Sequence, residues 1–145
     1  MAIRFHRAAL ALACSLVLLT ACETVEQRES KEARMSVLDV IFSWDGTTPC
    51  AKSESPPFVV RNIPEGTRTL RFSLSNEADP LAEFGGGDVP YTPNGRGLAT
   101  LAPGAFTYRG PCSPELVGMY KWTVLALDQD GKLLVGGWAK KKYPQ

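Results

Sequence analysis

Histidine is almost absent from this chain of 145 residues, since the only one is His6. It lies in an N-terminal segment, residues 1–21, whose pattern is that of a cleaved export signal. Once that segment is removed, the rest of the chain has no histidine. This absence excludes a Ser-His-Asp or Cys-His catalytic arrangement, and also a zinc site with histidine ligands.

A strong charge of either sign is also lacking. The chain has 16 Lys and Arg against 15 Asp and Glu, and two of the arginines, Arg4 and Arg7, belong to the N-terminal segment. The remaining chain therefore has 14 basic and 15 acidic residues, a net charge of about −1. A chain so near neutrality lacks the basic footprint of a nucleic-acid-binding protein, so we expect no nucleic-acid partner.

Sustained helical periodicity is the third absence. Apolar residues instead recur at every second position, most clearly along residues 120–127, where Tyr120, Trp122, Val124 and Ala126 alternate with their neighbours. Short alternating stretches separated by turns predict a mainly β fold, with two packed sheets in a β-sandwich. The predicted strands cover residues 38–44, 58–61, 69–75, 97–102, 120–127 and 133–138.

Residues 1–21 contain two arginines and then an apolar run of about twelve residues, Ala8–Leu19. The run is too short to span a bilayer as a helix and is typical of a signal peptide. The next residues, Leu19-Thr20-Ala21-Cys22, resemble the lipobox of bacterial lipoproteins. This resemblance implies cleavage before Cys22 and lipid on its thiol, so that the membrane is the first expected partner. An ordinary signal peptide with a chance cysteine is the alternative.

The segment after the lipobox is strongly charged. Seven of the twelve residues from Glu23 to Arg34 are charged, so the segment cannot bury enough apolar surface to offset ordering. We predict a flexible tether over residues 22–34 and one folded domain over residues 35–145. In Gram-negative lipoproteins an aspartate after the lipidated cysteine favours the inner membrane, so Glu23 implies sorting to the outer membrane, facing the periplasm.

Four cysteines are present, and two of them have other fates. Cys14 lies in the signal segment and Cys22 would carry lipid, which leaves Cys50 and Cys112. In an oxidising compartment this pair predicts a disulfide, with two buried thiols as the alternative.

Three stretches have no clear strand pattern. Residues 47–57 are predicted to be a loop, and residues 76–96, with the triple glycine 85–87, a functional or mobile loop. The glycines are expected to serve flexibility, because no Gly-Lys-Ser/Thr ending marks a nucleotide site. The basic run at residues 140–142 is predicted to be a solvated tail, with contact to anionic lipid headgroups as the alternative.

Three segments in order carry a family resemblance: Ser55-Pro56-Pro57-Phe58, Ile63-Pro64-Glu65-Gly66-Thr67, and Gly110-Pro111-Cys112-Ser113-Pro114 with the strand behind it. They resemble the Ser-Pro-Pro, Pro-x-Gly-Thr and Gly-Pro-Cys-Pro-Pro motifs of the phosphatidylethanolamine-binding protein (PEBP) family, in its bacterial Raf-kinase-inhibitor-like branch. The similarity covers residues 50–128. It implies a shortened PEBP-like β-sandwich with a small anion pocket at one end, suited to phosphate-like headgroups.

The residues that build the family pocket differ in this chain. Gly118 stands where the family has a histidine, while Tyr120 matches the family tyrosine. The Asp-Pro-Asp-x-Pro loop aligns with residues 76–80, so that Asn76 and Ala78 replace its two aspartates. Glycine supplies neither the hydrogen-bond donors nor the positive charge of a histidine, which predicts weaker headgroup binding.

The resemblance still implies a candidate ligand site. Pro111 and Cys112 would shape its rim, Tyr120 would donate its hydroxyl, and Asn76 and Asp79 would line the opposite side. For Tyr120, a place in the core with the hydroxyl at the sheet edge is the alternative.

The sequence therefore predicts a membrane-anchored binding module for a small anion, a phosphorylated headgroup or an envelope protein. A structural or assembly lipoprotein without a small ligand is the alternative. We expect no cofactor, no metal and no enzymatic activity, because the best acid and base candidates, Glu77 and Asp79, have nothing to separate their pKa values. Arg96 or Arg109 would restore a cation only by pointing inward, and both are expected at the surface.

Overall fold

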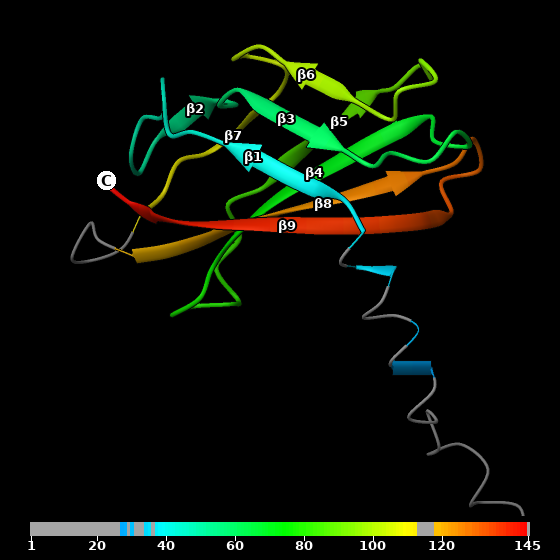
Figure 1. The fold of residues 1–145 in the computed structure, drawn as a ribbon. Helices are drawn as coiled ribbons and strands as arrows, with labels where there is room; N and C mark the ends of the chain where they lie inside the picture. The colour runs from blue at the N-terminus through cyan, green and yellow to red at the C-terminus, as the bar shows by residue number, and fades with distance from the viewer. Residues whose placement is uncertain (1–26, 29, 31–33, 36, 113–117, 145) are drawn as a thin grey trace, which may run out of the picture.

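A computed structural model describes residues 27, 28, 30, 34, 35, 37–112 and 118–144, and it is mainly β (Figure 1). The predicted signal segment and Cys22 lie outside these residues. Within the described part, no helix has the length and apolarity needed to cross a membrane. The strands are β1 (Asp39–Phe42), β2 (Lys52–Glu54), β3 (Phe58–Arg61), β4 (Thr69–Asn76), β5 (Gly86–Pro90), β6 (Ala99–Leu101), β7 (Thr107–Arg109), β8 (Gly118–Leu127) and β9 (Leu133–Tyr143).

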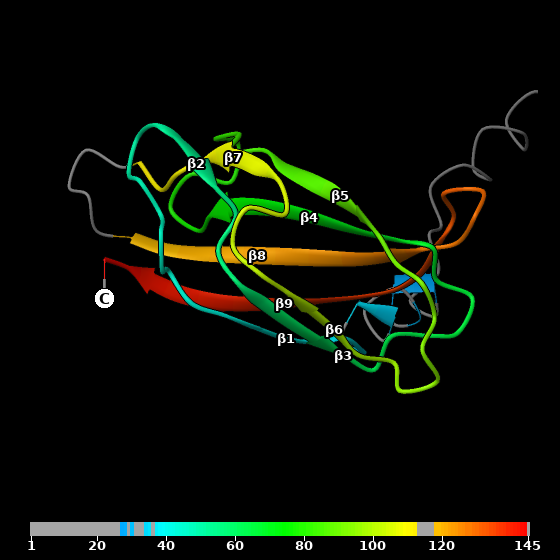
Figure 2. The same ribbon diagram turned by 90° about the horizontal axis from the view of Figure 1, so that it is seen from above.

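The strands form three antiparallel sheets, with orders β5-β4-β8-β9, β1-β3-β6 and β2-β7. The four-stranded sheet and the three-stranded sheet face each other (Figure 1), and β2 and β7 lie at the end where β9 finishes (Figures 1 and 2). The ring centre of Phe58 on β3 is 4.7 Å from that of Phe72 on β4 and 5.2 Å from that of Trp122 on β8. The two inner faces therefore share one core.

The period-two pattern accounts for this core. Successive side chains of a strand point to opposite faces, so alternating apolar residues place one face of the strand inside. The alternation predicted most of the buried residues on and beside β1, β4 and β8: Leu38, Val40, Phe42, Trp44, Leu70, Phe72, Leu74, Tyr120, Trp122, Val124 and Ala126. Asn76 and Leu127 are buried as well.

The chain before β1 joins the edge of β9. The backbone N–H groups of Val37 and Leu38 both donate to the carbonyl of Gly136, at 3.1 and 3.0 Å, and Leu38 forms a parallel bridge with Gly137. A Cβ atom on Gly137 would overlap the carbonyl oxygen of Leu38. Glycine at this position thus permits the close approach that links the three-stranded sheet to the four-stranded one.

Two segments predicted to be loops contain strands. Residues 47–57 include β2, which pairs with β7 far along the sequence. Residues 76–96 include β5, in which Gly86 pairs with Ser73 and Gly87 pairs with Phe72. A Cβ atom added to Gly86 would overlap the carbonyl oxygen of Phe72, and one added to Gly87 would overlap the side chain of Phe106. The prediction of a flexible glycine loop is wrong here, because these two glycines serve close packing within a strand.

The prediction of a solvated tail at residues 140–142 is also wrong. The hairpin turn after β8 was predicted, and the Asp128 side chain fixes it by accepting from the N–H groups of Asp130 and Lys132, both at 2.9 Å. However, the returning strand β9 continues to Tyr143, because the start of β8 offers it backbone partners along residues 118–121. The basic run is therefore part of a sheet.

Candidate functional site

Three side chains form a row across the four-stranded sheet at the end where β9 finishes. The strand register places Asn76 of β4 opposite Tyr120 of β8, and Tyr120 opposite Lys141 of β9. Residues directly opposite one another on neighbouring strands project to the same face. Tyr120 is only 1% exposed and lies in the core, so all three belong to the inner face. We call Asn76, Tyr120 and Lys141 the end row.

Lys141 brings a positive charge to this face. Its Nζ lies 5.2 Å from the ring centre of Phe42, which is buried on β1 in the facing sheet. The side chain is half-buried and reaches from β9 toward the opposite sheet. A cation above an aromatic face is stabilised by the ring quadrupole, and Lys141 holds its ammonium group in this way.

Aromatic packing and a turn fix the other two members of the end row. The Tyr120 ring packs edge-on against Trp44 and Phe84, with centroid distances of 6.1 and 5.5 Å. The Asn76 side-chain oxygen accepts a hydrogen bond from the backbone N–H of Ala78 at 2.9 Å, which starts the turn after β4. Tyr120 is thus held rigidly, and Asn76 orders the loop beside it.

The predicted disulfide is present, between Cys50 and Cys112, whose Cα atoms are 4.5 Å apart. Beside it, Pro111 is fully buried, and its carbonyl accepts a hydrogen bond from the N–H of Cys50 at 3.1 Å. A Cβ atom on Gly110 would overlap the carbonyl oxygen of Thr48. The bridge, the proline and the glycine therefore lock two loops together near the end of the core.

The other candidate residues lie farther out. Asp79 is exposed in the turn after β4, where its backbone carbonyl accepts from the N–H of Ala82 at 3.1 Å. Arg96 and Arg109 are both exposed, as the sequence predicted, so neither restores an inward cation. Among the described residues, no cluster of three or more His, Cys, Asp and Glu side chains is arranged to hold a metal ion.

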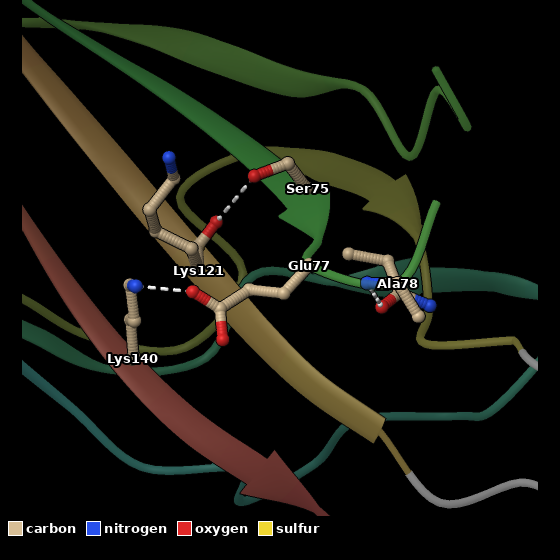
Figure 3. A network of polar contacts seen from close by, with 6 residues as sticks. Ser75, Glu77, Ala78, Lys121 and Lys140 are labelled. Atoms are coloured by element: carbon tan, nitrogen blue, oxygen red, sulfur yellow. Dashed lines mark hydrogen bonds and ion pairs between the residues drawn. The ribbon is translucent and has the colours of Figure 1, made fainter. Parts of the chain in front are cut away.

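Glu77 has a partner on β9. Its carboxylate forms an ion pair with the Nζ of Lys140, and Figure 3 shows this contact crossing over β8. In the same view the Ser75 hydroxyl donates to the backbone carbonyl of Lys121, at 3.4 Å. These contacts lie on the outer face of the sheet, which separates Glu77 from the end row.

A second tyrosine is buried near the disulfide loop. The Tyr108 hydroxyl lies 2.9 Å from Oγ1 of Thr47, and its ring packs 5.0 Å from that of Trp122. Burial raises the pKa of Tyr108 above its ordinary value of 10.0, although hydrogen bonds to Thr47 and Ser53 act in the opposite direction. The phenol is therefore neutral at physiological pH.

This raised pKa predicts a loss of stability in alkali. A group whose pKa is higher in the folded state stabilises the fold below its unfolded pKa, and the contribution is lost as the pH rises through the folded pKa. We expect wild-type stability to fall more steeply above about pH 10 than that of Tyr108→Phe, measured by urea unfolding across that range. Near pH 8 the variant should differ only by the lost hydrogen bond, about 1 kcal/mol. Parallel pH profiles would contradict the assignment.

The sequence interpretation missed Lys141. The alternation that begins β9 continues through Val135, Gly137, Ala139 and Lys141, and this signal could have placed the lysine on the inner face. The inward direction of Lys141 was missed because three consecutive lysines at residues 140–142 usually indicate a solvated surface.

Comparison of the sequence with models of known protein families gives no match, and comparison with curated proteins gives no relative either.

Proposed function

We propose that this chain is an exported lipoprotein whose domain binds a small anion or a phosphorylated headgroup at the end row. Lipid on Cys22, after removal of residues 1–21, would hold it to the outer membrane, facing the periplasm. Residues 22–34 would then tether a shortened PEBP-like β-sandwich at residues 35–145. Facing sheets around one core, and a disulfide that fixes the Gly-Pro-Cys loop, support this proposal.

The observation that carries the proposal is the position of Lys141. Lysine offers a compact positive charge with three donors, and it binds phosphate as a point charge. Gly118, which aligns with the histidine of the PEBP family, pairs with Tyr143, two residues beyond Lys141. Lys141 is therefore the diagonal neighbour of Gly118, and it supplies a cation next to the place where the family histidine would stand.

Partial burial strengthens this arrangement. An ammonium group that is half-buried attracts an anion more strongly than one in bulk water, because the effective dielectric is lower. The buried ring of Tyr120 and the ordered turn at Asn76 leave little conformational freedom to lose on binding. A small anion with several oxygen atoms fits such a site better than a large apolar ligand.

The test compares two adjacent lysines on opposite faces of β9. We expect millimolar inorganic phosphate or phosphoethanolamine to raise the melting temperature of the wild-type protein. Lys141→Gln should weaken this binding roughly 10- to 150-fold, the range for a lost charge-assisted hydrogen bond. The control Lys142→Gln removes the same charge from the outer face and should bind as the wild type does. Equal effects of the two variants, or no stabilisation by either anion, would contradict the anion site.

A structural or assembly role, with an envelope protein as the partner, is the second candidate. The observation that favours it is an apolar groove of about 230 Å³ that is lined by residues on and beside β1, β3 and β6. Ile41, which lines the groove, is 43% exposed. A protein that shows no anion-dependent stabilisation, and that co-purifies with a partner lost on Ile41→Asp, would favour this role over the first.

A further inference from the structure

The outer face of the four-stranded sheet combines positive charge with exposed apolar side chains. Met119 is 41% exposed and Trp138 is 50% exposed, whereas most large apolar side chains of the described chain are buried. The register places Met119 opposite Lys142 and Lys121 opposite Lys140. These side chains therefore lie together on one face. We call Met119, Lys121, Trp138, Lys140 and Lys142 the basic face.

The charges of this face do not cancel. Lys140 pairs with Glu77 (Figure 3), and on β4 of the same sheet Arg71 pairs with Asp88 on β5. Across the ranges that the structure describes, Lys121 and Lys142 make no ion pair. The face thus keeps an excess of two positive charges, next to an indole ring that the Lys140 ammonium group approaches to 5.1 Å.

The N-terminal segment arrives on the same side. A Cβ atom on Gly136, an outer-face position, would lie 2.7 Å from the sulfur of Met35, so Met35 packs against this face. Figure 1 likewise shows the described tether residues on the side of the four-stranded sheet that faces away from the three-stranded one. If the tether is anchored in a membrane, the side of the domain that carries the basic face would therefore lie toward that membrane.

We propose that the basic face rests on an anionic lipid surface. Lysines near such a surface are attracted by its negative potential, and tryptophan is favoured at the interface because its ring is apolar and its N–H is polar. Met119 adds apolar area beside it. The inference rests on the proposed function only in that the membrane anchor would keep the domain close to the lipid surface. It is independent of anion binding at the end row.

The test uses the full chain, purified from cell membranes in detergent and reconstituted with vesicles. The vesicles contain phosphatidylcholine alone, or phosphatidylcholine with phosphatidylglycerol, and carry brominated acyl chains that quench tryptophan fluorescence. Trp44 is 9% exposed and Trp122 is fully buried, so Trp138 is the tryptophan that lipid can reach among those described. We expect strong quenching in the anionic vesicles and weak quenching in the neutral ones, with Trp138→Phe abolishing the difference.

The charge variants complete the test. Lys121→Gln with Lys142→Gln should lower the ratio of docked to undocked domains roughly 25-fold, since each basic residue contributes about fivefold. The matched control, Lys52→Gln with Arg109→Gln, removes two exposed charges from β2 and β7 and should change nothing. Equal quenching in both vesicle types, or equal effects of the two double variants, would overturn the proposal.

Vesicle flotation separates this proposal from the membrane anchor. Flotation with anionic but not neutral vesicles would support the basic face even where the anchor fails. Flotation with both vesicle types, without a difference in quenching, would leave the anchor standing and overturn the basic face. Flotation with neither would overturn both.

Discussion

Replacing Cys50 and Cys112 together by alanine is expected to lower the free energy of unfolding by about 4 kcal/mol. The two residues are 62 positions apart in the sequence, so the bridge closes a long loop and removes much of the conformational freedom of the unfolded chain. Urea unfolding of the wild-type and double-variant proteins measures the difference. For a domain of this size the melting temperature should fall by about 15 °C or more.

A reductant provides the control for this prediction. Reduced wild-type protein should unfold at nearly the same urea concentration as the double variant, and the reductant should have no effect on the variant itself. A loss of stability below about 1 kcal/mol would contradict the loop-entropy explanation. It would mean that residual structure already restricts this loop in the unfolded chain without the bridge.

Trp122→Ala is expected to destabilise the fold by about 3–5 kcal/mol. Trp122 is fully buried at the centre of β8, and its ring lies 5.2 Å from Phe58, 5.8 Å from Phe106 and 5.0 Å from Tyr108. Truncation would leave a cavity between the facing sheets that these rings cannot fill. Chemical denaturation, followed by far-ultraviolet circular dichroism, measures the change without depending on tryptophan fluorescence.

The exposed Trp138 is the matched control. Trp138→Ala removes the same side chain from the outer face of β9, where it is 50% exposed, so it should cost less than about 1 kcal/mol. Similar losses for the two variants would contradict the assignment of inner and outer faces along β8 and β9.

The alternation of apolar residues predicted the strands that line the core, because one buried face imposes a period of two. Phe58–Arg61 was predicted with the bounds that β3 has, and the inward residues of β4 and β8 followed from the same rule. The disulfide followed from counting the cysteines of a chain that was predicted to be exported. The strands were predictable because their pattern is local in the sequence. The disulfide was predictable because only two cysteines remained to pair.

The sequence could not predict pairings between distant segments. β5 reads Gly-Gly-Asp-Val-Pro, which has no apolar alternation, and it is a strand because β4 offers it a partner. β2 has three residues and depends on β7 in the same way. Such strands are specified by tertiary contacts rather than by local propensity.

The candidate site shows the same limit. The resemblance to the PEBP family selected Asn76 and Tyr120 separately, whereas their pairing across β4 and β8 depends on the register. Lys141 joins them only because β9 continues beyond Trp138, where the local pattern indicated a tail. A residue's inward or outward direction reverses with a shift of one position, so the functional role of a lysine in a basic run depends on the sheet that holds it.

The junction of β1 with β9 bears on when this protein can fold. β9 is the last described strand, and it lies between β8 and the segment that leads into β1. A nascent chain that still lacks residues 133–143 cannot form the junction of Val37 and Leu38 with β9, so its two apolar layers are not joined along that side. We therefore expect the two layers to join along this side only after residues 133–143 have been synthesised. In the proposed exported lipoprotein, this order would leave the precursor open for threading through a translocation channel.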